Sequence, residues 1–292
     1  MTSSSVTDDP YTLEPGGIYL PERPVQHRED EYNSHSFEQL RRMEQRHFWY
    51  AGRYRFILHC VNRQLRQIRS QAPPFRAIDL GGGCGGWIKY LKDHAPGRFA
   101  ELALADSSLR GLGLAANVVG DDVNRYQVDL LDLQWRDRWD VAFLLDVLEH
   151  IPDDVKALEQ IWTALRPGGL LFVATPALKF FWSYNDEAAH HVRRYSRADF
   201  RRLATAANFE CRSTRYFMFL LSPLLMLSRM KRPNLEEMSA DQIREHCAHT
   251  HRVPAAPVNQ ALRLVFSLET PLGSWLPFPW GTSVLGIFRK SG

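Results

Sequence analysis

A run of glycines directly behind an apolar stretch places the strongest constraint on the fold. The segment AIDLGGGCGGW, residues 77–87, has five glycines between Gly81 and Gly86. Glycine weakens the interior of a helix or strand, but it permits backbone conformations that other residues avoid. The segment therefore predicts a buried strand that ends in a tight turn, where the backbone can approach a ligand, followed by a helix near 86–94.

Strand and helix patterns alternate after this turn. Apolar runs predict strands at FRAIDL, ELALAD, RYQVDL, WDVAFLLD, LLFVATP, FECRSTRYF and, at the end of the sequence, TSVLGIFRK. Helical patterns lie near 108–117, within 153–169 and near 197–208, and Asp153 is a candidate N-cap for the second of them. Such alternation is typical of an α/β fold with a mostly parallel sheet and helices on both faces.

Further segments surround this core. The expected order is a disordered tail (1–36), a helical cap (37–72), the core (73–217), a helical insertion or substrate lid (218–280) and the final strand of the core (281–292). The tail is expected to be disordered because its beginning is polar and acidic. The cap is interpreted as two helices interrupted at Gly52.

Composition narrows the class of protein. A net charge of +3 and 45% hydrophobic residues indicate a soluble globular chain and imply no nucleic-acid partner. Four cysteines without a CxxC pair fit a cytoplasmic protein. The apolar run at 217–227 is shorter than the roughly 20 residues of a membrane span. Two interpretations of it stay open, a core or lid helix, or peripheral membrane contact through 217–232.

The segment EHCAHTH, residues 245–251, combines histidines with a cysteine. Its spacing matches no closed zinc site, and a second pair of ligands is missing. It is interpreted as a polar surface segment, and no metal ion is expected in this protein.

Three acidic residues indicate what the glycine turn binds. Asp79, in the strand before the turn, suits the amino group of a ligand. Asp106 ends the second strand, where a carboxylate can accept both hydroxyls of a ribose. Asp129, beside Leu130 at the end of the third strand, can bind an adenine edge. An amino-acid tail, a ribose and an adenine together describe S-adenosylmethionine, and no Gly-Lys-Ser/Thr sequence is present for a triphosphate.

The chain resembles the class I S-adenosylmethionine-dependent methyltransferases. DLGGGCG resembles their first motif, WDVAFLLDVLEHIPDD their fourth-strand motif and LRPGGLLFVATP the motif that leads into strand five. The resemblance implies a Rossmann-like sheet of seven strands whose last strand is antiparallel. It implies cofactor contacts from Asp79, Gly81, Gly83, Gly85, Asp106, Ser107, Asp129, Leu130, Leu145 and Asp146.

Two more segments resemble a bacterial subgroup found among enzymes that build glycolipids, polysaccharides or small natural products. They are HFWYAGRYRFI, residues 47–57, and FFWSYNDEAAHHVRRYSRADF, residues 180–200. The first resembles a helix that covers the cofactor. In it, Trp49 could stack over the sulfonium and Arg53 could pair with the methionine carboxylate. Packing in a core is the alternative for the aromatic residues.

A hydroxyl acceptor needs a base, and the second segment offers candidates. The candidate catalytic residues are His191, His150, Asp186 and Tyr195. Histidine is the natural base near neutral pH, and Asp186 could orient its imidazole. His191 could instead only orient the loop. Arg193 or Arg194 could hold an anionic substrate group or pair with Asp186 and do nothing else.

Four functions remain open from the sequence. The first is methyl transfer to an oxygen or nitrogen of a small molecule in biosynthesis, such as that of a natural product. The second is methylation of a lipid-linked or glycolipid substrate at the membrane surface. The third is a non-catalytic module that binds S-adenosylmethionine, which the intact acidic and glycine positions disfavour. A nicotinamide dehydrogenase is a weaker fourth, because it needs the turn to face a pyrophosphate.

Overall fold

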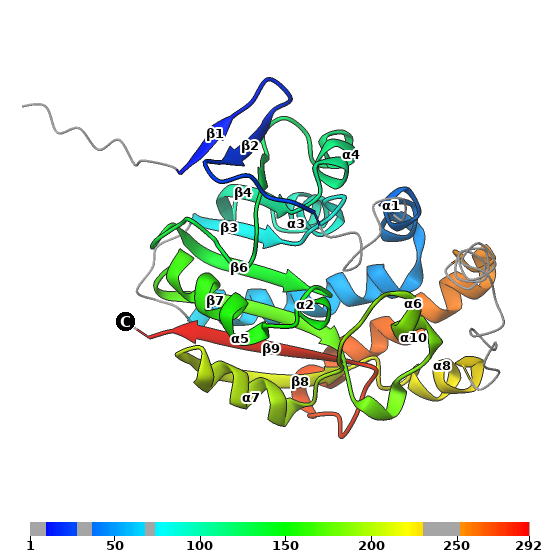
Figure 1. The fold of residues 1–292 in the computed structure, drawn as a ribbon. Coiled ribbons are helices and arrows are strands. Elements are labelled where there is room, and N and C mark those ends of the chain that lie inside the picture. Colours follow the sequence, from blue (N-terminus) through cyan, green and yellow to red (C-terminus); the bar gives the residue numbers. More distant parts are fainter. Residues whose placement is uncertain (1–9, 28–36, 68–73, 230–251, 292) are drawn as a thin grey trace, which may run out of the picture.

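The structure is a computed structural model that describes residues 10–27, 37–67, 74–229 and 252–291. It is built around a mixed sheet of nine strands in the order β1-β2-β5-β4-β3-β6-β7-β9-β8 (Figure 1). The strands are β1 (Tyr11–Leu13), β2 (Ile18–Pro21), β3 (Phe75–Leu80), β4 (Phe99–Asp106), β5 (Asn124–Gln127), β6 (Trp139–Leu145), β7 (Leu165–Pro176), β8 (Phe209–Phe217) and β9 (Ser283–Lys290). The last strand, β9, runs antiparallel to both of its neighbours, β7 and β8. The predicted Rossmann-like α/β fold is confirmed.

Helices cover both faces of the sheet. They are α1 (Phe37–Arg46), α2 (Phe48–Gln67), α3 (Gly86–His94), α4 (Leu109–Val119), α5 (Asp154–Ala164), α6 (Tyr184–Ala188), α7 (Arg197–Ala206), α8 (Ser222–Arg229) and α10 (Ala256–Trp275). Successive residues of β6 point to opposite faces. Val141 and Phe143 pack in the cluster under α2, α3 and α10, whereas Ala142 and Leu144 pack in the cluster under α5 and α7. The Asp153 carboxylate accepts a hydrogen bond from the Lys156 N–H and caps α5, as predicted.

The N-terminal segment differs from the prediction. Residues 10–27 are not a disordered tail, because β1 and β2 form an antiparallel pair and β2 joins β5 in parallel. The sheet therefore has nine strands and not seven. Aromatic side chains explain the order: Tyr19 stacks on Tyr126 at 4.7 Å between ring centroids, and Tyr11 lies 4.5 Å from Trp135. The prediction of disorder rested on the polar composition of the tail and gave no weight to these two tyrosines.

The break in the N-terminal helices is also displaced from its predicted position. Gly52 lies inside α2, and the break follows Arg46. The side chain of Asn259 in α10 spans this break, since it accepts from the Phe48 N–H at 2.9 Å and donates to the Arg46 carbonyl at 2.8 Å. Gly52 instead permits close packing, because a Cβ there would collide with the ring of Phe266.

The region expected to be a helical insertion contributes α8 and α10, and α10 packs along α2. The segment EHCAHTH lies outside the described residues. Among the residues that the structure describes, no helix has both the length and the apolar character that a membrane span requires.

Candidate active site

The glycine turn joins β3 to α3 at the carboxyl edge of the sheet. Gly81, Gly83 and Gly85 have φ angles of 71°, 53° and 81°, in the left-handed region that favours glycine. The Gly81 N–H donates to the Ala105 carbonyl of β4 at 2.7 Å, which fixes the turn against the next strand. The predicted strand, turn and helix are therefore present.

Asp106 and Ser107 lie at the end of β4, beside this turn. The buried Asp106 carboxylate accepts from the N–H groups of Gly83 and Ser108, each at 2.9 Å. The Ser107 hydroxyl lies 2.8 Å from Nδ1 of His27, in the segment that follows β2. Asp106 thus links the turn to β4 at the position expected for the ribose.

Asp129 and Leu130 follow β5 by two and three residues, so the third strand is slightly shorter than predicted. The Val128 N–H donates to the Asp106 carbonyl at 3.0 Å, which keeps this segment beside the end of β4. Asp129 accepts from the Leu131 N–H at 2.8 Å, and Asp129 and Leu130 are half-buried. The segment lies where the adenine contacts were expected.

Asp146 follows Leu145 at the end of β6 and is bound by a residue of α2. Its φ of 56° is unusual for a residue other than glycine. Arg53 is 3% exposed, and its Nη1 lies 3.0 Å from the Asp146 carboxylate. Its Cζ lies 4.8 Å from the centre of the Trp49 ring. Burial raises the pKa of Asp146, and Arg53 lowers it. The Nε and Nη2 atoms of Arg53 have no protein partner, so they remain able to bind a carboxylate.

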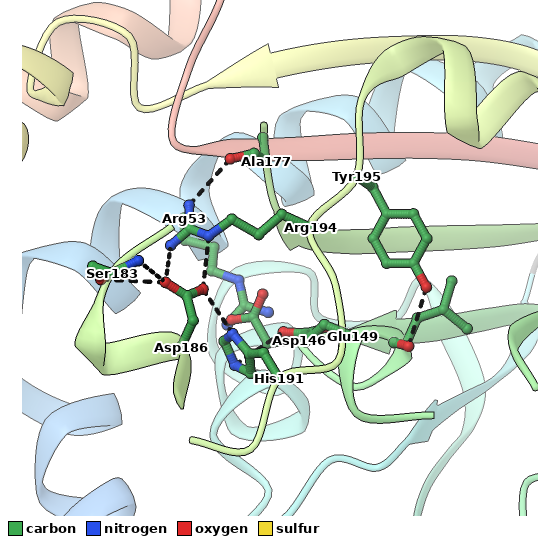
Figure 2. A network of polar contacts seen from close by, with 10 residues as sticks. Arg53, Asp146, Glu149, Ala177, Ser183, Asp186, His191, Arg194 and Tyr195 are labelled. Atoms are coloured by element: carbon green, nitrogen blue, oxygen red, sulfur yellow. Dashed lines mark hydrogen bonds and ion pairs between the residues drawn. The ribbon is translucent and has the colours of Figure 1, made fainter. Parts of the chain in front are cut away.

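His191 and Asp186 form a hydrogen-bonded pair in the segment after β7 (Figure 2). Nδ1 of His191 lies 2.9 Å from Asp186 Oδ1, and Arg194 donates to the same carboxylate at 2.7 and 3.0 Å. The Ser183 N–H adds a third donor at 2.8 Å. Although burial opposes ionisation, the hydrogen bonds from His191 and Arg194 lower the pKa of Asp186. An ionised Asp186 favours the imidazole tautomer with its proton on Nδ1, which leaves Nε2 as an acceptor.

Glu149, which the sequence reasoning did not assign, lies beside this pair. It is 0% exposed, and neither of its carboxylate oxygens has a hydrogen-bond partner. Its Oε1 is 4.0 Å from His191 Nε2, and the rings of His150 and His191 are 4.8 Å apart and nearly perpendicular. Burial, and then Asp146, raise the pKa of Glu149 well above its usual value. The sequence signal was the Leu-Glu-His triplet of the fourth-strand motif.

A metal ion is one group that these side chains could hold. The ligand atoms of Glu149, His150 and His191 all lie within 4.8 Å of one another. The sequence did not lead us to expect a metal ion, and the structure makes this cluster the place to test that expectation.

Tyr195 lies apart from the His191–Asp186 pair (Figure 2). Its hydroxyl, on a side chain that is 3% exposed, lies 2.9 Å from Asp154 Oδ2 and 3.2 Å from the Leu148 carbonyl. Burial, and then the Asp154 carboxylate, raise the pKa of Tyr195. Arg193 pairs with the same Asp154 at 2.7 Å. These contacts hold the loop on α5 and do not bring the Tyr195 hydroxyl to the imidazole.

Comparison with known proteins agrees with this geometry. A family described as a methyltransferase domain matches residues 27–214, which is more than half of the sequence. The chain belongs to this methyltransferase family. Its fold is that of the class I S-adenosylmethionine-dependent methyltransferases.

Curated relatives resemble part of this methyltransferase. The ubiquinone biosynthesis O-methyltransferase of Aeromonas salmonicida (strain A449) is 33% identical over 105 residues, which cover 34% of the chain and 42% of the relative. The trans-aconitate 2-methyltransferase of Deinococcus radiodurans is 28% identical over 130 residues, with coverage of 44% and 46%. The matched part therefore spans less than half the length of these relatives.

Solved structures share the fold. A methyltransferase in complex with the Haloferax volcanii Trm112 methyltransferase activator gives a TM-score of 0.55 at 17% identity, with 90% of this chain and 97% of that chain covered. The Haemonchus contortus phosphoethanolamine N-methyltransferase 2 in complex with S-adenosyl-L-methionine gives 0.50 at 15% identity, with coverage of 78% and 51%.

The cofactor of the methyltransferase is S-adenosylmethionine, and the residues present fit it. Beside the glycine turn, buried donors on Arg53 and a buried acceptor on Asp79, Oδ1, have no protein partner. A zwitterionic amino-acid tail supplies both missing partners, because its carboxylate accepts and its ammonium donates.

Proposed function

We propose that this methyltransferase transfers the methyl group of S-adenosylmethionine to a hydroxyl oxygen of a small biosynthetic intermediate, with His191 as general base. The pairing of His191 with Asp186 carries the proposal. When the ionised Asp186 carboxylate accepts a hydrogen bond from His191 Nδ1, the Nε2 atom is free to accept the hydroxyl proton. The same carboxylate stabilises the imidazolium that results.

The chemistry is an in-line displacement at carbon. The acceptor oxygen forms a bond to the methyl carbon while the sulfur–carbon bond breaks, and the hydroxyl proton passes to His191 Nε2. The products are the methyl ether, S-adenosylhomocysteine and a proton that His191 later releases to solvent. Positioning the acceptor and excluding water account for much of the rate in such reactions.

Oxygen is favoured over nitrogen because a neutral amine requires no base. The relative from Aeromonas salmonicida is named as an O-methyltransferase of ubiquinone biosynthesis. The relative from Deinococcus radiodurans is named as a trans-aconitate 2-methyltransferase. A relative from Caenorhabditis elegans is named phosphoethanolamine N-methyltransferase 2, so an amine acceptor remains the alternative to test. We place the reaction in the cytoplasm.

Activity with a panel of acceptors tests the proposal. The purified chain is incubated with methyl-labelled S-adenosylmethionine and matched phenols, hydroxy acids, carboxylic acids and amines. His191→Gln is expected to lower kcat on a hydroxyl acceptor by a factor of about 10²–10⁴. Cofactor affinity, measured by calorimetry, should stay at the wild-type value. His190→Gln is the matched control, because His190 is the exposed neighbour.

An unchanged kcat in His191→Gln would show that His191 is not the general base. Transfer to amines alone, with the same rate in both variants, would replace the O-methyltransferase proposal by an N-methyltransferase. Tight cofactor binding without transfer to any acceptor class would favour the non-catalytic binding module.

A second candidate is methylation of a lipid-linked acceptor at the membrane surface. It rests on apolar side chains that α8 and α10 expose to solvent. They include Leu224 and Leu227 of α8, and Leu264, Leu268, Leu272 and Trp275 of α10, the last of which is 86% exposed. Leu264, Leu268 and Leu272 follow one another at four-residue spacing, which places them on one face of α10.

Sedimentation with vesicles tests this candidate. Wild-type protein should pellet with phosphatidylglycerol-containing vesicles, and Leu268→Glu should remain in the supernatant with unchanged cofactor affinity. Val192→Glu is the control, because Val192 is an exposed apolar residue outside these helices. Equal recovery of wild type and Leu268→Glu in the supernatant would exclude the membrane contact.

A further inference from the structure

Three carboxylates gather around the glycine turn, and they differ in how they are satisfied. Asp106 accepts from two backbone N–H groups. Asp79, in β3, is buried with Oδ1 unpartnered, and Glu44, in α1, has a buried Oε2 that also lacks a partner. Asp79 Oδ1 and Glu44 Oε2 are therefore two buried acceptors without a hydrogen-bond donor beside one turn.

The charge of this cluster is not balanced by the protein groups that act on it. Burial, and then repulsion from Glu44, raise the pKa of Asp79 well above its usual value. Burial raises the pKa of Glu44 to about 7, against a hydrogen bond from Tyr54 and one from the Gly86 backbone that lower it. Arg53 lowers both pKa values, but its Nη1 is already paired with Asp146 at 3.0 Å. A cationic group between Asp79 and Glu44 would relieve this repulsion.

The position of Glu44 is fixed from two sides. The Tyr54 hydroxyl donates to its Oε1 at 2.9 Å, and α1 packs against α3. The carboxylate lies over Gly86, the first residue of α3, since a Cβ there would come within 2.6 Å of Oε1 and 2.7 Å of Oε2. Figure 1 shows α1 on the side toward which the arrowheads of β3 and β6 point, where the glycine turn lies. Glu44 is therefore held at the end of the turn without belonging to it.

We propose that Glu44 binds the α-ammonium group of the methionine part of S-adenosylmethionine, opposite Asp79. The ammonium has three donors, and the two orphaned oxygens supply two acceptors. The cap helix would then belong to the cofactor site through a charged contact, in addition to covering it. The proposal depends on the cofactor but not on the acceptor or on the role of His191.

A structural role for Glu44 is the competing explanation. A carboxylate over the first turn of α3 also interacts favourably with that helix end and holds α1 in place. The two roles differ in one respect: only the proposed contact requires the amino group of the ligand.

The experiment varies the protein and the ligand together. Calorimetry measures the affinity of wild type and Glu44→Gln for S-adenosylhomocysteine and for its analogue without the α-amino group. Wild type is expected to prefer S-adenosylhomocysteine by about tenfold or more, as is typical of a hydrogen-bonded charge. Glu44→Gln should reduce this preference to about threefold or less, because the ammonium loses its charged acceptor. Glu38→Gln, at an exposed glutamate of the same helix, should keep the wild-type preference.

An equal loss of affinity for both ligands in Glu44→Gln would assign Glu44 the structural role and overturn the proposal, as would an undiminished preference. If Glu44→Gln does not fold, Glu44→Asp takes its place. That variant keeps the charge but withdraws it by one methylene, so a full wild-type preference there also overturns the proposal. These measurements involve no acceptor and no turnover, so a failure of the proposed O-methyltransferase activity leaves their outcome readable.

Discussion

The carboxylate of Asp186 organises the loop after β7, and its removal should be costly. It accepts hydrogen bonds from His191, Arg194 and the Ser183 N–H, and the side chains of Arg194 and Asp186 are only 4% and 0% exposed. Asp186→Asn keeps the shape but leaves the Arg194 charge buried without its partner. Breaking a buried pair in this way costs about 3–5 kcal/mol. We expect that loss in the free energy of unfolding at pH 7, measured by urea denaturation.

The pH dependence of this loss has a defined sign. The pKa of Asp186 is lowered in the folded protein, so its ionised form stabilises the fold above the unfolded pKa of about 3.9. The difference between wild type and Asp186→Asn should be constant near neutral pH and should shrink as the pH falls below about 4. Glu187→Gln, at the exposed neighbouring carboxylate, should cost less than about 1 kcal/mol. An Asp186→Asn protein within about 1 kcal/mol of wild type at pH 7 would refute the reasoning.

Three further perturbations test the other parts of the site. Asp106→Ala should weaken binding of S-adenosylmethionine at least about tenfold in calorimetry, since each ribose hydrogen bond to a charged acceptor contributes about 1.5–3 kcal/mol; wild-type affinity would contradict the ribose assignment. Gly52→Ala should cost about 1–3 kcal/mol, seen as a lower Tm, because the new Cβ meets the buried Phe266 ring; an unchanged Tm would show that α10 does not need the close approach. Dialysis against a chelator should leave methyl transfer unchanged if His191 is a base, whereas a loss that Zn²⁺ or Mn²⁺ restores would make it a metal ligand beside Glu149 and His150.

The core of the fold was accessible from sequence because its signals are local. The apolar run into Gly81, the cap at Asp153 and the turn before α3 are each read within about ten residues. A parallel sheet then follows from their alternation, and the placement of Asp106 and Asp146 at its carboxyl edge follows from the sheet.

The N-terminal hairpin and the helical break could not be predicted in this way, because non-local contacts decide them. Tyr11 and Tyr19 pack on Trp135 and Tyr126, which lie more than a hundred residues away in the sequence. The break after α1 is stabilised by Asn259. Nothing near Gly52 distinguishes a glycine that ends a helix from one that admits a neighbouring ring.

The missed acidic residues show a second limit of sequence reasoning. Leu40 and Glu44 follow Phe37 by three and seven residues, so all three lie on the same face of α1. The position of Glu44 on this face was therefore a usable signal. Glu149 is different, because a carboxylate inside an acidic motif is ordinarily solvated. Its side chain is completely buried, and the segment that carries His191 lies beside it, since the Val192 N–H donates to the Glu149 carbonyl at 2.9 Å.

The same non-local contacts give the insertion before β9 a role at the cofactor site. Arg53 of α2 pairs with Asp146 at the end of β6, and α2 packs along α10. Asn259 of α10 also fixes the angle at which α1 leaves α2, and α1 carries Glu44 to the glycine turn. A substitution in α10 that loosens this packing should therefore weaken cofactor binding without touching the cofactor. On this reasoning the helix α10, between β8 and β9, is part of the framework that holds α1 and α2 in place.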